Sequence, residues 1–367
     1  MSRMQRVITL AVIAATLLAA ASTAEAATPR APRGFFGVMW DRAAMDRRPV
    51  DESAQWALMR RSGVESVRVV FNWAQAQPDP AAEPDFSATD AKVELAARNG
   101  IHLLPVVLYT PDWAARYPTR HGTPPEFPSD YAAFMTRLVQ RYGPQGSFWA
   151  ERPDVPRRPL RDWQIWNEPH FDFYWYTPGG SWAPEYVKLL KAARTAVKAA
   201  DPGARIVLAG FADASWKILS AVYRAGARRA FDVATINLFT GRPGFVMTAV
   251  RLTRHVLKRE HEGRKPIWIT ETTFPAARGL VPLPEKEWQR RWYTTRIGMA
   301  KRLTELYRLG RVNARRLGLR RIYWYTWASS YAGQDDLFDY AGLVKVGNDG
   351  ASSSQPALRA YRRASRN

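Results

Sequence analysis

The chain has 367 residues, no cysteine and a formal net charge of +21. Without cysteine it can form no disulfide and lacks the thiolates that many zinc sites use, so its stability must come from a hydrophobic core. The length fits one large α/β barrel or two smaller domains, and the order of elements along the chain decides between them.

The first 26 residues have the pattern of a secretory signal peptide. A basic start precedes an apolar run from Val7 to Ala21, and small residues up to Ala26 suit a cleavage site. That run is too short for an ordinary transmembrane helix, and no later segment is long and apolar enough to span a membrane. We therefore expect residues 1–26 to be removed and residues 27–367 to form a soluble protein, secreted or associated with the cell envelope.

Apolar stretches alternate with helical patterns along the rest of the chain. The eight predicted strands cover residues 34–40, 64–73, 101–109, 163–168, 205–211, 231–239, 266–271 and 321–327. The predicted helices cover 51–62, 88–98, 129–142, 184–201, 214–225, 246–262 and 285–309, and a short last helix opens at Gln355-Pro356. Strands that alternate with helices form parallel sheets, and eight of them favour a closed (β/α)8 TIM barrel, an α/β fold, as a single domain.

Two of the predicted strands end in a glutamate. The run Trp-Gln-Ile-Trp-Asn-Glu-Pro-His ends strand four with Glu168, and the run Pro-Ile-Trp-Ile-Thr-Glu ends strand seven with Glu271. Active sites of these barrels lie at the carboxyl ends of the strands, where strands four and seven face each other across the mouth. Because glycosidic bonds are cleaved by two carboxyl groups that flank the anomeric carbon, Glu168 and Glu271 are the candidate catalytic pair.

Several motifs together resemble one group of enzymes. They are Trp-Asn-Glu-Pro at 166–169, Trp-Ile-Thr-Glu-Thr at 268–272, Arg68 within Val-Arg-Val-Val-Phe-Asn-Trp, and Trp327 at the end of strand eight. The ordered set resembles the clan A glycoside hydrolases, and most of all family 39 and its cellulase-like bacterial relatives. The resemblance covers nearly the whole chain after the signal peptide, but it does not specify a substrate.

The resemblance implies a retaining mechanism. Glu168 would be the general acid/base, and Glu271 the nucleophile that forms a glycosyl-enzyme. Arg68 would lie beside Glu271 and favour its ionised form. Asn167 would contact the sugar 2-hydroxyl, an interaction that strengthens in the transition state.

One position departs from the family pattern. Members of the clan often end strand six with a His or Asn followed two residues later by a Tyr whose hydroxyl touches the nucleophile, whereas this chain has Asn237 and then Phe239. Asn237 can still donate a hydrogen bond in the site, but Phe239 cannot. A hydroxyl would have to come from elsewhere, such as Tyr325 or Tyr109, unless the nucleophile is tuned differently.

Aromatic residues at predicted strand ends give a second indication of a sugar site. Trp40, Trp113 and Trp327 fall at or just beyond such ends, and sugar rings present apolar C–H faces that stack on aromatic side chains. We therefore expect these three tryptophans at the mouth, although packing in the core explains many of the 15 tryptophans equally well.

Other chemistries fit less well. The histidines lack the spacing of metal ligands, and the chain has neither a Gly-x-Ser-x-Gly elbow nor a dinucleotide-binding glycine turn, so we expect no metal and no cofactor. The positive charge is spread along the chain without a basic arm, so no nucleic acid is expected as a partner.

The favoured function is that of a secreted retaining glycoside hydrolase. Its expected partner is a carbohydrate substrate, and the candidates include an acidic or cell-envelope polysaccharide. A transglycosylase would use the same two carboxyl groups and differ only in the acceptor. A catalytically silent sugar-binding barrel would keep the aromatic residues and lose a carboxylate. The hypothesis of a polyanion-binding protein rests on charge alone. It predicts an affinity for nucleic acid or acidic glycan that falls steeply with salt.

Overall fold

The computed structural model describes residues 30–333 and 336–366. The predicted signal peptide lies outside the described residues. Among the described helices, none combines the length and the apolar character that a membrane span requires.

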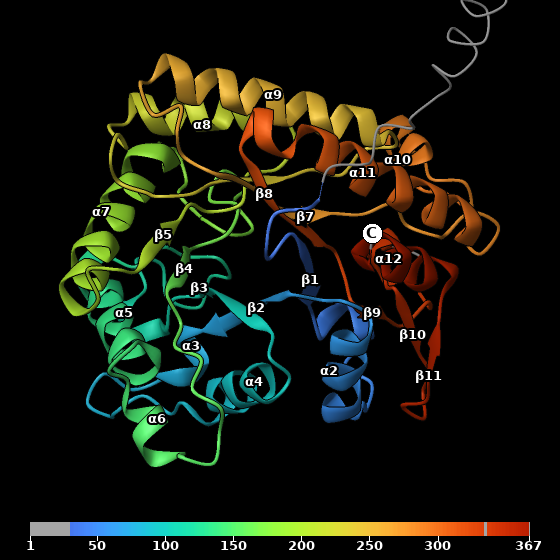
Figure 1. Cartoon of the computed structure of the whole chain (residues 1–367). Helices are drawn as coiled ribbons and strands as arrows, with labels where there is room; N and C mark the ends of the chain where they lie inside the picture. The colour runs from blue at the N-terminus through green and yellow to red at the C-terminus, as the bar shows by residue number, and fades with distance from the viewer. Residues whose placement is uncertain (1–29, 334–335, 367) are drawn as a thin grey trace, which may run out of the picture. The chain divides into compact units, whose positions relative to one another are not determined.

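Eight parallel strands form the centre of the fold (Figure 1). They are β1 (Phe36–Trp40), β2 (Ser66–Asn72), β3 (His102–Leu108), β4 (Asp162–Ile165), β5 (Arg205–Val207), β6 (Ala234–Asn237), β7 (Ile267–Thr272) and β8 (Leu319–Trp324). The sheet runs β5-β4-β3-β2-β1-β8-β7-β6, and a bridge between Val207 and Val233 joins its two ends. The predicted (β/α)8 barrel is therefore confirmed.

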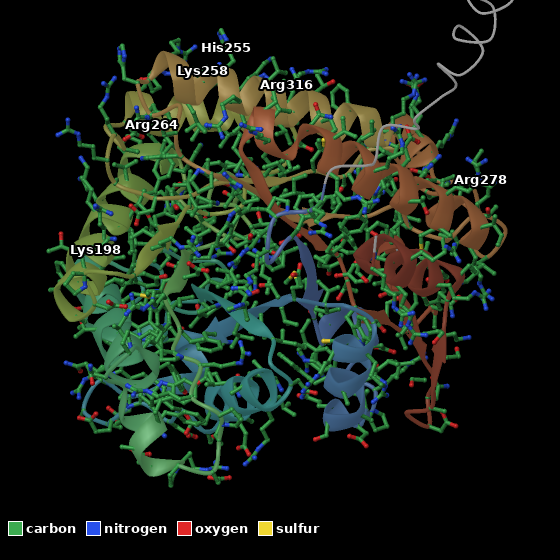
Figure 2. The ribbon with its side chains drawn as sticks, viewed as in Figure 1. Lys198, His255, Lys258, Arg264, Arg278 and Arg316 are labelled. Carbon is green, nitrogen blue, oxygen red and sulfur yellow. The ribbon has the colours of Figure 1, made fainter. Side chains whose placement is uncertain are left out.

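Helices follow the strands and lie outside the sheet (Figure 1). They are α2 (Glu52–Arg61), α3 (Trp73–Ala76), α4 (Ser87–Arg98), α5 (Pro128–Tyr142), α6 (Ser147–Glu151), α7 (Trp182–Ala200), α8 (Ser215–Arg224), α9 (Pro243–Arg259), α10 (Glu287–Trp292), α11 (Arg296–Leu317) and α12 (Pro356–Arg366). Basic side chains cover their outer faces: Figure 2 shows Lys258 on α9 and Arg316 on α11 pointing away from the strands. Such solvated charges account for part of the high net charge.

Several predicted elements have other bounds in the structure, such as strands five and six, which are shorter than expected, and two of the differences change the course of the chain. The single helix expected over 285–309 is divided into α10 and α11, because the side chain of Thr295 accepts a hydrogen bond from the amide of Gly298 and begins a new helix there. Strand eight ends at Trp324 rather than at residue 327. The chain then enters a second, three-stranded sheet of β9 (Ala328–Ser329), β10 (Val344–Val346) and β11 (Ser352–Ser354).

The inside of the barrel is filled in layers between the ends of its strands. An apolar cluster occupies the middle, made of Leu104, Val207, Val233, Trp268 and Tyr323. At the end where the strands begin, Asp162 accepts two hydrogen bonds from Arg205, at 2.6 and 2.8 Å, and one from Arg321 at 3.1 Å. Arg321 also lies over the ring of Trp268 at 4.2 Å. This ionic layer closes the barrel floor.

Replacing Asp162 with Asn should destabilise the fold. The carboxylate is 8% exposed and accepts from Arg205 and Arg321, so its loss leaves the buried guanidinium of Arg321 without a carboxylate, at a cost of about 3 kcal/mol in the free energy of unfolding. Asp154→Asn is the control, because that carboxylate pairs with Arg98 at the solvent-exposed surface and should matter little. Urea unfolding of both variants measures the difference, and equal stability would contradict the assigned role of the floor layer.

Candidate active site

A cavity of about 410 Å³ opens at the carboxyl ends of the strands. We call it the mouth cavity. The residues that line it are Met39, Asp41, Ala43, Arg68, Val70, Val106, Leu108, Tyr109, Asn167, Glu168, Phe173, Tyr174, Phe239, Glu271, Tyr325, Asp336 and Phe338. Both predicted catalytic glutamates, Arg68 and Asn167 are among them.

Strand alternation places Arg68 inside the barrel. In β2 every second side chain points to the same face, so Ser66, Arg68 and Val70 all point inward. Arg68 is 1% exposed, and a guanidinium this buried must have its N–H groups paired. The strands around it therefore have to supply acceptors.

The oxygen acceptors come from three other side chains. The guanidinium donates from Nε to Gln164 Oε1 at 2.7 Å, from one terminal nitrogen to Glu271 Oε1 at 2.6 Å, and from the other to Asn167 Oδ1 at 2.8 Å. Arg68 thus fixes the side chains that end β4 and β7 relative to each other. The bond to Glu271 is a charge-assisted hydrogen bond, and such bonds are the strong ones.

An irregularity in β7 turns Glu271 into the cavity. Trp268 and Thr270 already point inward, so plain alternation would direct Glu271 outward. The pairing register of β7 shifts against both neighbouring strands, against β6 next to Asn237 and against β8 beyond Ile269. Bulges of this kind re-aim side chains and occur often beside active sites.

A strained backbone after β4 likewise directs side chains into the cavity. Trp166 and Glu168 adopt positive φ angles of 68° and 44°, which residues other than glycine rarely do. The amide of Glu168 donates to the backbone oxygen of Gly210 at 3.0 Å, which holds the kinked segment against the end of β5. Consecutive residues Asn167 and Glu168 both reach the cavity as a result.

Asn237, the last residue of β6, is hydrogen-bonded to Glu168 and to Thr270 of β7. Its amide nitrogen donates to Glu168 Oε1 at 2.8 Å, and its amide oxygen accepts from the hydroxyl of Thr270 at 2.7 Å. Gly210 makes room for it, since a Cβ at position 210 would lie within 2.6 Å of the Asn237 amide. Asn237 is fully buried and does not line the mouth cavity, so it is placed to orient Glu168.

The two glutamates have different electrostatic surroundings. Burial, assisted by the neighbouring charge of Glu271, raises the pKa of Glu168 from 4.5 to about 8, and Asn237 only partly opposes this. Burial also raises the pKa of Glu271, but the ion pair with Arg68 counteracts that effect. With a pKa of about 8, Glu168 keeps its proton at neutral pH, while the bonded guanidinium favours the ionised form of Glu271.

The three predicted tryptophans do not reach the mouth cavity. Trp40 points out of β1 against Trp56 of α2, because the neighbouring positions of β1 point inward. β8 ends before Trp327, so this residue does not follow the inward and outward alternation of the strand. Its ring nitrogen donates to Gln55 Oε1 at 2.9 Å. Trp113 packs edge-on against Trp73 at 5.6 Å, and its ring nitrogen donates to a backbone oxygen. All three contribute to packing.

Sequence reasoning missed two polar side chains in or next to the cavity. Asp41 follows directly after β1, and the hydroxyl of Tyr325 donates to it at 2.6 Å. Gln164 lies two residues before Trp166 and supports Arg68. Asp41 was detectable as an acidic residue at a strand end, and Gln164 as a polar residue at an inward position of a buried strand.

Tyr325, one of the two expected sources of a hydroxyl, lines the mouth cavity. Its ring contacts Phe239 at 6.1 Å, and its hydroxyl is hydrogen-bonded to Asp41. Tyr109, the other expected source of a hydroxyl, also lines the cavity. Within residues 30–333 and 336–366, no group of three or more acidic or histidine side chains is arranged to hold a metal ion.

The fold is the (β/α)8 barrel that occurs in clan A glycoside hydrolases. A family 39 glycoside hydrolase from Bacteroides cellulosilyticus WH2 superposes with a TM-score of 0.65 at 19% identity, over 91% of this chain and 64% of that one. This chain thus spans less than two thirds of that structure's length.

Two further structures show the same barrel. A monomeric β-xylosidase from Caulobacter crescentus CB15 gives a TM-score of 0.63 at 16% identity, over 91% of this chain and 69% of that one. A GH53 catalytic domain from Ignisphaera aggregans gives 0.62 at 20% identity, over 91% and 97%. No family model and no curated protein sequence matches the chain.

Gly210→Ala should destabilise the protein by about 1–3 kcal/mol, because the added methyl group displaces the buried amide of Asn237 from its hydrogen bonds. Gly244→Ala is the matched control: it lies in the first turn of α9, where an added Cβ meets nothing within 4 Å, so helix propensity should make it neutral or slightly stabilising. Urea unfolding distinguishes the two. A Gly210→Ala variant as stable as the control would show that Asn237 is not held there.

Proposed function

We propose that the protein is a retaining glycoside hydrolase, secreted after removal of residues 1–26, with residues 27–367 as its catalytic domain. The observation that carries the proposal is the pair of glutamates in one cavity, of which only Glu271 is bonded to a guanidinium. One carboxyl group that keeps its proton and one that is ionised are what double displacement requires. The barrel fold supports the proposal, because the similar structures include glycoside hydrolases.

In this mechanism Glu271 attacks the anomeric carbon and forms the glycosyl-enzyme, while Glu168 gives its proton to the leaving oxygen. Glu168 then accepts a proton from the water that hydrolyses the intermediate. Asn167 contributes to binding: its amide oxygen accepts from Arg68, which directs its NH2 group away from Arg68 and makes it available to a sugar hydroxyl. Arg68 and Asn237 act through the glutamates that they orient.

The cavity lining favours an uncharged sugar in the active site. Two more carboxylates, Asp41 and Asp336, line it beside the glutamates, and Arg68 is the only cation among the described lining residues. A uronic acid or a sulfated sugar would meet repulsion from Asp41 and Asp336, whereas neutral hydroxyls can donate to them. Aromatic rings such as Tyr174 and Phe338 offer surfaces for the C–H faces of the sugar.

Glu168→Gln and Glu271→Gln test the two roles separately on aryl glycosides. With a sugar or methylumbelliferyl leaving group, Glu168→Gln should lower kcat/KM by about 10²–10⁴-fold, because no proton reaches the leaving oxygen. A dinitrophenyl leaving group needs no proton, so formation of the glycosyl-enzyme from it should be nearly normal in this variant. Glu271→Gln should lose activity on both kinds of substrate.

Glu305→Gln, an exposed position on α11, is the control and should keep full activity. Proton NMR of the first product of the wild-type enzyme should show the anomeric configuration of the substrate. Inversion of configuration, or an active Glu271→Gln variant, would refute the retaining assignment. Faster product formation on addition of a sugar acceptor, with transfer exceeding hydrolysis, would identify a transglycosylase instead.

The pH dependence of kcat/KM should report the proton on Glu168. Because the raised pKa is that of an acid that must stay protonated, the alkaline limb of the profile should fall as the pH rises through about 8, and protonation of Glu271 should limit activity on the acid side. Glu271→Gln removes the neighbouring negative charge and should lower the pKa of Glu168. Titration of the glutamate carboxyl carbons by NMR measures this shift, and an unchanged pKa of Glu168 in the variant would contradict the coupling.

A further inference from the structure

A second cavity, of about 610 Å³, lies at the opposite end of the barrel, where the strands begin. It is lined by Val93, Ala96, Ala97, Ile101, His102, Leu103, Pro156, Arg157, Arg158, Pro159, Leu160, Arg161, Asp162, Arg205 and Arg321. A neighbouring hollow of about 520 Å³ shares His102 and Arg158 with it and adds Arg33 and Arg60. We call the two together the floor groove. The proposed catalytic glutamates line neither part.

Positive charge in the floor groove exceeds its negative charge. Among the lining residues only Asp162 and Glu65 carry negative charge. Asp162 is already bonded to Arg205 and Arg321, and Glu65 accepts a hydrogen bond from the amide of Phe36 at 3.1 Å. The groove therefore holds several guanidinium groups that its own carboxylates do not neutralise.

Arg157 and Arg158 show this excess most clearly. In the described part of the chain neither forms an ion pair, and Arg157 donates only to the backbone oxygen of Pro144. For Arg161, the carboxylate in range is that of Asp201, at 3.9 Å. Burial, together with the charges of Arg321 and Arg158, lowers the pKa of His102, as expected in a region of positive potential.

The chemistry of the lining selects among anionic ligands. All the permanently charged cationic side chains of the lining are arginines, whose planar guanidinium groups bind carboxylate, sulfate or phosphate groups through two hydrogen bonds. Apolar side chains such as Val93 and Leu160 separate them, which suits a ligand with apolar faces between its anionic groups. Apart from His102 the lining has no aromatic ring on which bases of a single-stranded nucleic acid could stack.

We propose that the floor groove binds an acidic polysaccharide chain. Such a chain combines regularly spaced carboxylate or sulfate groups with the C–H faces of pyranose rings, and two hollows that share residues fit an extended ligand better than a single small anion. The site is separate from the mouth cavity, and its occupation does not depend on the catalytic roles of Glu168 and Glu271.

Binding of fluorescently labelled oligogalacturonate chains to the full protein tests the proposal. The double variant Arg157→Glu/Arg158→Glu should weaken binding by about tenfold or more, since each lost charged hydrogen bond costs a large fraction of that factor. Affinity for the unaltered protein should fall steeply with added salt, and less steeply for the variant. Neutral dextran should not bind the groove.

The matched control is Arg251→Glu/Lys258→Glu, which changes the net charge by the same amount on the exposed face of α9. It should bind the oligogalacturonate nearly as well as the unaltered protein. Equal losses in the two double variants would overturn the proposal, because the effect would then come from net charge alone. Thermal unfolding of each variant confirms that it is folded before binding is measured.

Two further measurements complete the test. Arg60→Glu, at the far end of the groove, should weaken binding of long chains and leave short ones unaffected, whereas equal effects on both would refute an extended site. Tighter binding of polyphosphate, a single-stranded oligonucleotide or phosphatidylglycerol vesicles than of oligogalacturonate would also overturn the assignment. Glu168→Gln should bind as the unaltered protein does, so failure of the catalytic proposal and failure of this one are distinguishable.

Discussion

The buried guanidinium of Arg68 determines how the mouth of the barrel is organised. A charge that is 1% exposed is tolerated only with its donors paired, and here the partners are Gln164, Asn167 and Glu271. These bonds orient the amide of Asn167 and pair the carboxylate of Glu271 with a cation, which favours its ionised form. The strained backbone after β4 and the bulge in β7 bring those partners within reach of Arg68. The same backbone geometry that pairs the buried charge therefore also forms the site.

The barrel itself could be predicted from the sequence because its strands are buried on both faces. Continuous apolar runs bounded by glycine and proline identify such strands, and their alternation with helical patterns leaves few other folds. The ends of elements were harder to predict. Hydrophobicity continues from Trp324 to Trp327, but the chain leaves the barrel between them, and the break before α11 depends on one capping hydroxyl, that of Thr295. Neither event changes the periodicity that sequence reasoning depends on.

The candidate site divides in the same way. Glu168 and Asn167 were predicted at the mouth because a carboxyl or amide group at the end of a buried strand is unfavourable to bury unless it has partners or a function. The tryptophans were misplaced, since an aromatic residue near a strand end suits core packing as well as a sugar, and only the register decides: Trp40 falls on the outward face of β1 while Asp41 beside it falls on the inward one. The place of Arg68 beside Glu271 was predicted from the family resemblance, whereas the burial that raises the pKa of Glu168 was not, because it depends on strands that lie far apart in the chain.

The two ends of the barrel carry opposite charge, with carboxylates around the mouth and arginines across the floor. If the floor groove binds an acidic polysaccharide as proposed, the floor would face that polymer and the mouth would face away from it. Adsorbed in this orientation, the enzyme would move along a two-dimensional surface with the active site directed at uncharged strands above the layer that holds it. The acidic polymer would then act as an anchor, and the neutral glycan as the material that is cut.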